Sequence, residues 1–224
     1  MNTNEFYKMG EELKEAFAVF EKIFNSIADV NNKKESDEEM IVYKKCKMLI
    51  HPKDIKVGDQ IEVPLDGIGT FTATAHQITD EGILFIFDDC ITRRQINSNG
   101  KNKGGFEKSE LAEWMRSTLY EAFPEELKKG LQYITLPSYG QMFGHDEWYE
   151  KAIVPDDDEQ LPLMKIRKNR MCTYENDNCW YWLRNATKED YSSDCFASVG
   201  SVGGASCNDS DDDDGGVRPA FLLN

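Results

Sequence analysis

Apolar residues near the start of the chain recur at a helical spacing. One set recurs every seven residues and consists of Phe6, Leu13, Phe20 and Ile27. Phe17 and Phe24 widen this stripe, so the pattern predicts an amphipathic helix over residues 5–30 with an aromatic face. Such a face must be covered, either by the rest of the chain or by a second copy in a homo-oligomer, and both alternatives stay open. The charged run that follows predicts a linker, which completes a first region at residues 1–39.

From residue 40 onward the pattern changes to short alternating segments. Residues 55–63 alternate between apolar and polar side chains around a Gly-Asp turn. The predicted elements are strands at 55–63, 71–75 and 82–87, a glycine-rich loop at 97–105, a helix at 109–123 and a short helix that begins at Pro124. Ser109 is a candidate N-cap for the longer helix.

The last segment, residues 170–224, combines short apolar runs with long polar loops. Cys179–Arg184 is aromatic and predicts a buried strand, and a shorter strand follows at 196–199. Val217–Leu223 predicts the last strand, where Pro219 suits an edge or strand-start position. The chain is therefore expected to form an α+β domain over residues 40–224, with short antiparallel sheets and two or more helices.

Charge narrows the choice of partner. The formal net charge is −15, which repels phosphate backbones and anionic lipids. The longest apolar run, Ile83–Phe87, is far too short to cross a bilayer. We therefore expect a protein or cell-surface ligand, with no nucleic acid and no membrane insertion. The N-terminus lacks the pattern of a secretory signal, which leaves the site of action open: inside the cell, on a virion or on a cell surface.

Cysteine and histidine usage gives no catalytic pattern. The six cysteines include no CxxC pair, which argues against a structural zinc ion and favours free, mostly buried thiols. A bridge between Cys195 and Cys207 is the alternative if the protein works outside a cell. The three histidines lie in no hydrolase or metalloprotease motif, and no phosphate-binding glycine loop is present. No catalytic residue is predicted.

Two C-terminal motifs carry a family resemblance. Trp180–Arg184, a stretch rich in Ser, Gly and Asp, and Gly216–Phe221 together resemble a bacterial and phage domain family that ends in WWLRS…GVRPAF. The resemblance spans roughly residues 40–224. That family is similar to the formylglycine-generating-enzyme-like branch of the C-type lectin fold, which includes the variable proteins of diversity-generating retroelements. The resemblance implies a non-enzymatic, C-type-lectin-like ligand-binding domain with display loops at 185–216.

The composition of the C-terminal segment fits adenine-directed diversification. Such retroelements vary mainly Asn codons, which can never become Lys, Glu, Gln, Trp or Met. None of these five residue types occurs between Asp190 and Asn224. An ordinary polar loop has the same composition, so this alternative stays open.

The resemblance implies a set of ligand-binding side chains in and next to the display loops. They are Tyr181, Asn185, Tyr191, Ser192, Ser193, Asp194, Ser198, Ser201, Asn208, Asp209, Ser210, Asp211, Asp212 and Asp213. Arg184 and Arg218 are expected to be structural, bonding loop carbonyls or a buried carboxylate. Asp209–Asp214 could offer oxygens to calcium, but the run lacks the spacing of a calcium loop, so a solvated acidic loop is favoured and no metal or cofactor is predicted.

Two other functions compete with this one. A formylglycine-type oxidase would need Cys195 and Cys207 as its thiol pair, although their acidic surroundings should raise the thiol pKa. A structural or assembly component would use the N-terminal helix.

Overall fold

The structure is a computed structural model that describes residues 41–43, 48–50 and 55–224. The chain divides into two compact units, Met1–Met40 and Ile41–Asn224, and every described element belongs to the second. The predicted helix over 5–30, its linker and any association between copies through them lie outside the described residues.

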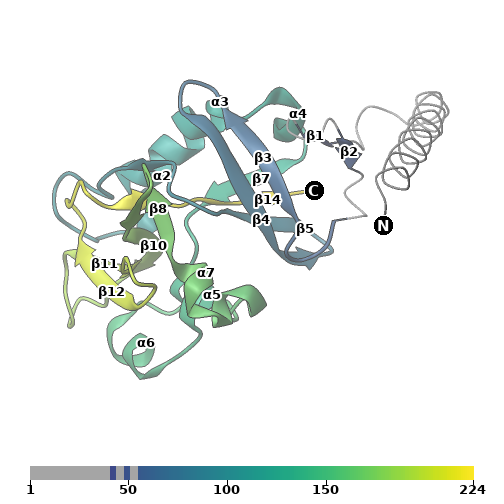
Figure 1. The fold of residues 1–224 in the computed structure, drawn as a ribbon. Helices are drawn as coiled ribbons and strands as arrows, with labels where there is room; N and C mark the ends of the chain where they lie inside the picture. The colour runs from purple at the N-terminus through teal and green to yellow at the C-terminus, as the bar shows by residue number, and fades with distance from the viewer. Residues whose placement is uncertain (1–40, 44–47, 51–54) are drawn as a thin grey trace, which may run out of the picture. The chain divides into compact units, whose positions relative to one another are not determined.

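The first sheet has five antiparallel strands in the order β3-β4-β5-β14-β7 (Figure 1). They are β3 (Gln60–Leu65), β4 (Gly69–Thr79), β5 (Gly82–Phe87), β14 (Ala220–Leu223) and β7 (Leu131–Thr135). The prediction at 82–87 is confirmed as β5. The strand predicted at 55–63 starts only at Gln60, because Gly58 has a φ of 97° and the Asp59 amide bonds back to the Lys56 carbonyl in a turn.

The second sheet has the order β12-β11-β10-β13-β6. Its strands are β6 (Thr92–Arg93), β10 (Tyr181–Ala186), β11 (Cys195–Val199), β12 (Ala205–Asp209) and β13 (Gly216–Val217). β10 pairs in parallel with β13 at Tyr181 and Gly216, whereas the other pairs of this sheet are antiparallel. The strands predicted near 179–184 and 196–199 are present as β10 and β11, while β12 was not predicted.

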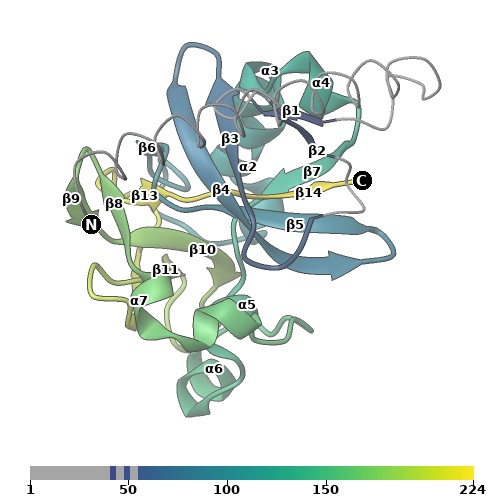
Figure 2. The same ribbon diagram turned by 45° about the vertical axis from the view of Figure 1, so that its right-hand side comes forward.

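The C-terminal segment joins the two sheets, and Figure 2 shows it in yellow as it leaves β13 and enters the first sheet as β14, which pairs with β5 and β7. The single strand predicted over Val217–Leu223 is therefore wrong. Pro219 has no amide hydrogen, and its carbonyl accepts from the Phe87 amide at 3.0 Å. Only Gly216 and Val217 of this segment lie in the same sheet as β10, and they pair with it at a single position, Tyr181 with Gly216.

Short helices and two ribbons complete the described chain. The ribbons are β1 (Ile41–Tyr43) with β2 (Met48–Ile50), and β8 (Cys172–Tyr174) with β9 (Asp177–Cys179). The helices are η3 (Phe106–Lys108), α2 (Glu110–Trp114), η4 (Met115–Leu119), α3 (Tyr120–Ala122), α4 (Glu125–Lys128), α5 (Tyr139–Phe143), α6 (Glu147–Ala152), η5 (Pro162–Lys165) and α7 (Arg167–Arg170). The predicted helix at 109–123 corresponds to α2, η4 and α3. The Ser109 hydroxyl caps it by accepting from the Ala112 amide at 3.1 Å.

Both faces of the first sheet are buried at β5 and β14. Phe85 and Phe87 point into a core that contains Trp182, while Leu84 and Ile86 point into a second core. Figure 2 shows α2 and α3 on one side of this sheet and α5, α6 and α7 on the other. Burial on both faces explains why β5 is a continuous apolar run rather than an alternating one.

Candidate functional site

The structure places most of the predicted ligand-binding residues at the surface. The exposed or half-buried ones are Tyr191, Ser192, Ser193, Asp194, Ser201, Asn208, Asp209, Asp211, Asp212 and Asp213. Four are buried, namely Tyr181, Asn185, Ser198 and Ser210. Tyr181, Ser198 and Ser210 cannot meet a ligand in solvent and are removed from the candidate site, whereas Asn185 lines a cleft that is described below.

Each buried residue has a structural reason for its position. The Tyr181 hydroxyl donates to the Arg170 carbonyl at 2.8 Å and accepts from Arg218, and burial raises the pKa of Tyr181 to about 12. The Asn185 side chain accepts from the Tyr139 amide at 2.7 Å and donates to Asp156 at 2.6 Å. Both belong to β10, a strand buried along most of its length, so alternation gives them no solvent-facing side.

Ser198 and Ser210 are buried for different reasons. The Ser198 hydroxyl faces inward from β11 and donates to Asn208 at 2.8 Å. Ser210 follows β12, and its carbonyl accepts from the amides of Ile96 and Asn97 at 2.8 and 2.9 Å. Its backbone therefore connects two segments that are more than a hundred residues apart in the sequence.

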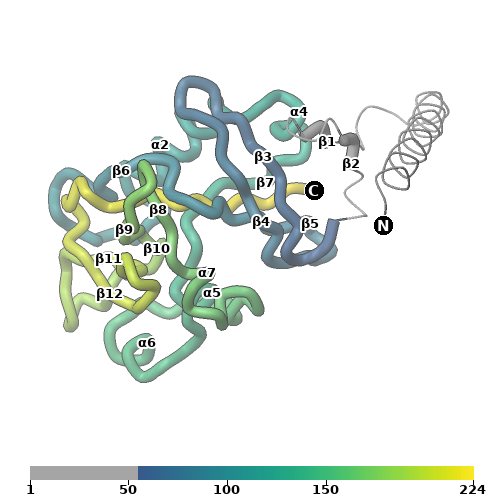
Figure 3. The backbone as a smooth tube through the Cα atoms, viewed as in Figure 1, coloured from purple at the N-terminus to yellow at the C-terminus, as the bar shows by residue number. Residues whose placement is uncertain are grey.

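Three segments meet beside the backbone bonds between Ser210 and residues 96 and 97. We call these segments, residues 97–105, 187–194 and 209–214, the loop cluster. Their backbone paths can be followed near β6, β11 and β12 in Figure 3. The Ser210 amide donates to the Asp194 carbonyl at 2.9 Å, which joins the second and third segments. The Asn102 amide donates to the Ser193 carbonyl at 3.0 Å, which joins the first and second.

Asn102 is the central side chain of the loop cluster. It is buried, and its amide nitrogen lies within 3.2 Å of four oxygen atoms: the carbonyls of Thr187, Ser192 and Cys195 and the Thr187 hydroxyl. An amide has two hydrogens, so these bonds are shared between acceptors. Asn97 has a similar role, because its side chain donates to the Lys101 carbonyl at 2.7 Å and accepts from the Glu110 amide at 3.1 Å. The loops are thus held through their backbones, and outward side chains such as those of Asp211 and Asp213 are exposed and belong to neither core.

The outward side chains of the loop cluster are predominantly acidic. Its segments contain eight Asp or Glu residues and three lysines. Lys101 pairs with Asp194 at 2.7 Å, and its side chain is 57% exposed. Asp212, Asp213 and Asp214 place one carboxylate oxygen each within 4.8 Å of one another, which is fewer than the six to eight oxygens that calcium requires.

Ser201 and Tyr191 occupy different positions relative to the loop cluster. Ser201 lies in the turn between β11 and β12, at the opposite end of the hairpin from the Cys195–Asp209 pair. Tyr191 is half exposed, and its ring packs edge-on against Trp148 of α6 at 6.0 Å between centroids. The structure therefore brings together the serines and aspartates at 192–194 and 209–213 and leaves Ser201 apart.

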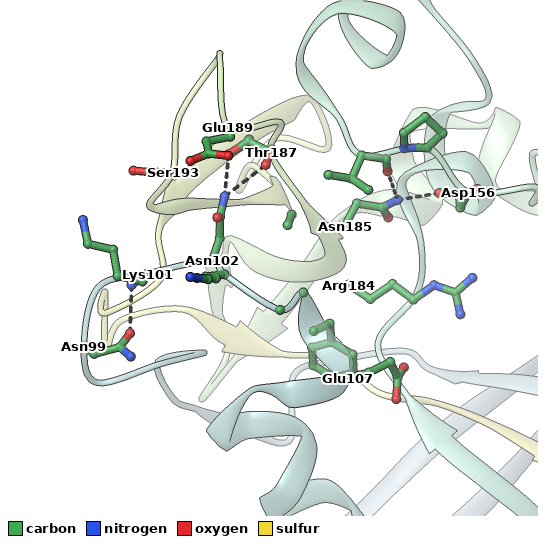
Figure 4. Close-up of a pocket in the computed structure, with 17 residues that line it drawn as sticks. Asn99, Lys101, Asn102, Glu107, Asp156, Arg184, Asn185, Thr187, Glu189 and Ser193 are labelled. Carbon is green, nitrogen blue, oxygen red and sulfur yellow. Dashed lines mark hydrogen bonds between the residues drawn. The ribbon is translucent and has the colours of Figure 1, made fainter.

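A cleft of about 1170 Å³ adjoins the loop cluster, as the close-up in Figure 4 shows. Lys101, Asn102 and Ser193 lie on one side of it, and Asp156 and Asn185 lie on the other. Arg184 from β10 also lines it and forms an ion pair with Asp158. No histidine or cysteine is found among the described residues that line this cleft. It can hydrogen-bond a polar ligand, and its described lining offers no histidine as a base for the hydroxyl groups of Thr187 and Ser193.

The two thiols nearest the C-terminus adjoin one another but are poorly suited to thiolate chemistry. Cys195 on β11 and Cys207 on β12 hydrogen-bond to each other. Burial raises the pKa of Cys195 to about 11, and Cys195 donates to an Asp209 carboxylate oxygen at 3.1 Å. Burial raises the pKa of Cys207 as well. At neutral pH both are protonated, which does not favour the oxidase alternative.

Sequence reasoning missed one third of the loop cluster. Residues 97–105 were predicted as a glycine-rich loop but not as part of the site. Their signal was local: Gly100, Gly104 and Gly105 all have positive φ and allow tight turns, while Asn97 and Asn102 can bond backbone groups. Nothing in the local sequence says which distant backbone these asparagines bond.

Comparison with known proteins adds no relative. No family model, curated protein or solved structure matches this chain. None of the helices in the described residues is long and apolar enough to cross a membrane. The C-type-lectin-like resemblance therefore stays a prediction carried by the two C-terminal motifs.

Proposed function

We propose that this chain is a non-enzymatic ligand-binding protein that presents the loop cluster on a C-type-lectin-like scaffold, and that its partner is a protein with a basic surface. The observation that carries the proposal is the buried Asn102 side chain, which comes from the 97–105 segment and bonds backbone carbonyls of Thr187, Ser192 and Cys195, so that two segments are joined while outer side chains such as Ser193 face solvent. Loops held in this way tolerate exchange of their outer residues, because those side chains make no core contacts.

The arrangement of the sheets supports the scaffold part of the proposal. The C-terminal segment crosses from β13 of the second sheet to β14, an interior strand of the first. Val217 of β13 and Phe221 of β14 both lie in the main core, so the strands behind the loop cluster share that core. Trp182 of β10 is fully buried in that core, and its indole donates to the Arg94 carbonyl at 2.8 Å. A stiff platform of this kind lowers the entropy that a binding loop loses on association.

The charge of the loop cluster supports the choice of partner. Asp209, Asp211 and Asp213 are exposed, and they carry negative charge on a protein whose net charge is already −15. Opposite potentials steer association and raise its rate, and like potentials suppress it. A basic protein surface therefore fits this face better than an acidic or nucleic-acid surface.

Binding to a basic probe tests the proposal. We expect immobilised decalysine and a panel of purified basic proteins to bind the wild-type chain at low salt. The triple variant Asp211→Asn, Asp212→Asn, Asp213→Asn should bind the best-binding probe with about tenfold lower affinity, because three charge contacts are lost. Surface interferometry at several salt concentrations measures the change.

A second triple variant separates a local site from general acidity. Asp157→Asn, Glu159→Gln and Glu175→Gln removes the same charge from exposed positions outside the loop cluster. It should change the affinity less than twofold. Equal weakening by both variants would mean that net charge alone attracts the probe, and the loop cluster would then not be the binding site.

The retroelement origin has a separate genomic test. A near-copy of the coding segment for residues 175–224 should lie downstream and differ at adenines. We expect the differing codons to be those of exposed residues such as Ser193, Asp211 and Asp213, and not those of the buried Ser198 and Ser210. Sequencing a few neighbouring kilobases that contain neither this template nor a reverse transcriptase gene would remove the diversification claim and leave the binding proposal in place.

A further inference from the structure

Three buried thiols from separate segments meet beside β13. Cys90 follows β5, Cys172 begins β8 and Cys179 ends β9, and each is at most 3% exposed. The sulfur atoms of Cys90 and Cys172 lie 3.2 Å apart. The Cys90 thiol also hydrogen-bonds to Cys179, so Cys90 contacts both of the others.

These sulfurs are not arranged as a metal centre. Among the described residues, only Asp212, Asp213 and Asp214 bring three possible ligand atoms within 4.8 Å of one another. The three sulfurs therefore form an open chain with Cys90 in the middle. A tetrahedral zinc site would instead need them to converge on one point at about 2.3 Å each.

We propose that this cluster is a thiol-oxidation site, in which Cys179 reacts first with a hydroperoxide and Cys90 and Cys172 end as a reversible disulfide. The bond would link the segment after β5 to the β8–β9 hairpin. The 3.2 Å contact between the two sulfurs leaves only a small movement before a bond of about 2.05 Å can form. The thiols adjoin the loop cluster, since Arg93 beside Cys179 pairs with Asp214 at 3.8 Å, but the inference does not rest on the proposed function.

Local charge makes Cys179 the reactive member. Hydrogen bonds from the Cys90 thiol and the Arg93 guanidinium lower the pKa of Cys179 to about 6. The Trp180 carbonyl oxygen lies 3.0 Å from the same sulfur and opposes a thiolate. Two donors outweigh one carbonyl dipole here, so the thiolate of Cys179 is favoured, whereas the pKa of Cys90 is raised by its thiol neighbours and by burial.

The hairpin that holds two of the thiols can open to admit a peroxide. Its strands have three residues each, and its turn places Glu175 and Asn176 at φ values of 53° and 73°, which is costly for side-chain-bearing residues. Two-stranded ribbons of this size are marginal by themselves. Its docking depends on a few bonds, among them the Cys90 amide to the Thr173 carbonyl at 3.0 Å and Thr173 to Asp89 at 2.7 Å.

The chemistry balances with hydrogen peroxide as oxidant. The Cys179 thiolate attacks one peroxide oxygen, the O–O bond breaks, and the released hydroxide takes a proton to become water. The Cys90 thiol then attacks the Cys179 sulfenic acid, an S–S bond forms, and the hydroxyl leaves as water with the Cys90 proton. The Cys172 thiol next attacks Cys90 and releases Cys179, which is a good leaving group because of its low pKa, and the proton passes to Cys179. Two thiols are oxidised, one peroxide is reduced, and two waters are formed.

The test uses a protein that lacks the three other cysteines, so that any disulfide found must come from this cluster. Cys195 and Cys207 adjoin each other and could form their own bridge, while Cys46 lies outside the described residues. We therefore use the full chain with all three replaced by serine. After treatment with hydrogen peroxide, mass spectrometry of the unreduced peptides should find a Cys90–Cys172 link with the loss of two hydrogens. The melting temperature should rise by about 5 °C and return to its starting value with dithiothreitol.

Single variants in this background test the order of events. Cys179→Ser should slow disulfide formation by at least about tenfold, because the thiol beside the Arg93 guanidinium is then lost. Cys172→Ser should leave a Cys90–Cys179 disulfide instead. The proposal is overturned if peroxide yields only sulfinic acid at these positions, if no link includes Cys90, or if Cys179→Ser forms the Cys90–Cys172 bond at the unchanged rate.

Discussion

Arg218→Met is expected to lower the free energy of unfolding by about 3 kcal/mol. The Arg218 side chain is buried between the two sheets. Its Nε donates to the Phe87 carbonyl at 2.7 Å, and one Nη donates to the Asn169 carbonyl at 3.2 Å and to the Tyr181 hydroxyl at 3.0 Å. Methionine fills a similar volume but leaves these buried acceptors without a donor. Removal of the buried charge offsets part of that cost. The expected loss of unfolding free energy is therefore smaller than the summed contributions of the separate hydrogen bonds.

Urea unfolding monitored by circular dichroism measures this loss, and Arg184→Met is the matched control. Arg184 pairs with Asp158, and both side chains are about 30% exposed (31% and 29%). Ion pairs with this much solvent contact contribute little, so Arg184→Met should change stability by less than about 1 kcal/mol. Equal losses in the two variants would contradict the structural role assigned to Arg218.

Gly215→Ala should lower the free energy of unfolding by about 3 kcal/mol, because a Cβ atom at this position would overlap the Trp182 indole ring. Neither the Trp182 ring nor the Gly215 backbone can move easily. Trp182 is fully buried and donates to the Arg94 carbonyl at 2.8 Å, while the Gly215 carbonyl accepts from the Arg94 amide at 2.9 Å. The same three residues thus bond to one another, and an added methyl group must break one of these contacts or shift β13.

Gly200→Ala is the control for this substitution. Gly200 lies in the β11–β12 turn, and the nearest atom to an added Cβ is the Gly204 carbonyl oxygen at an ordinary 3.6 Å. This change should cost less than about 1 kcal/mol. A Gly215→Ala protein as stable as wild type would show that the Trp182 platform is more adaptable than its contacts indicate.

Elements specified by local chemistry could be predicted from the sequence. Ile83–Phe87 is a strand because its side chains are branched or aromatic and because Gly82 and Asp88 interrupt the apolar run. The helix after Ser109 was predictable because its cap bond lies within three residues. Fold class follows from such elements, and the mixture of antiparallel sheets and short helices matches the expected α+β class.

Elements that depend on a distant partner were missed or misplaced. β12 is a polar segment that becomes a strand only because β11 pairs with it along five residues. The C-terminal strand is interrupted at Arg218 and Pro219 because the residues that follow, β14, pair with β5 in the other sheet. The same limit explains the buried Ser198, which faces inward because of its register and not because of its polarity.

The sequence by itself determined the apolar strand at 83–87, the capped helix, the acidic character of the C-terminal loops and the absence of familiar catalytic motifs. These properties depend on residues within a few positions of one another. Only the tertiary structure decided that residues 97–105 join the C-terminal loops through Asn102, and that Cys90 meets Cys172 and Cys179. Those contacts join groups 82 to 93 residues apart in the chain, and no local pattern encodes which backbone carbonyl or sulfur a given side chain will reach once both sheets have formed.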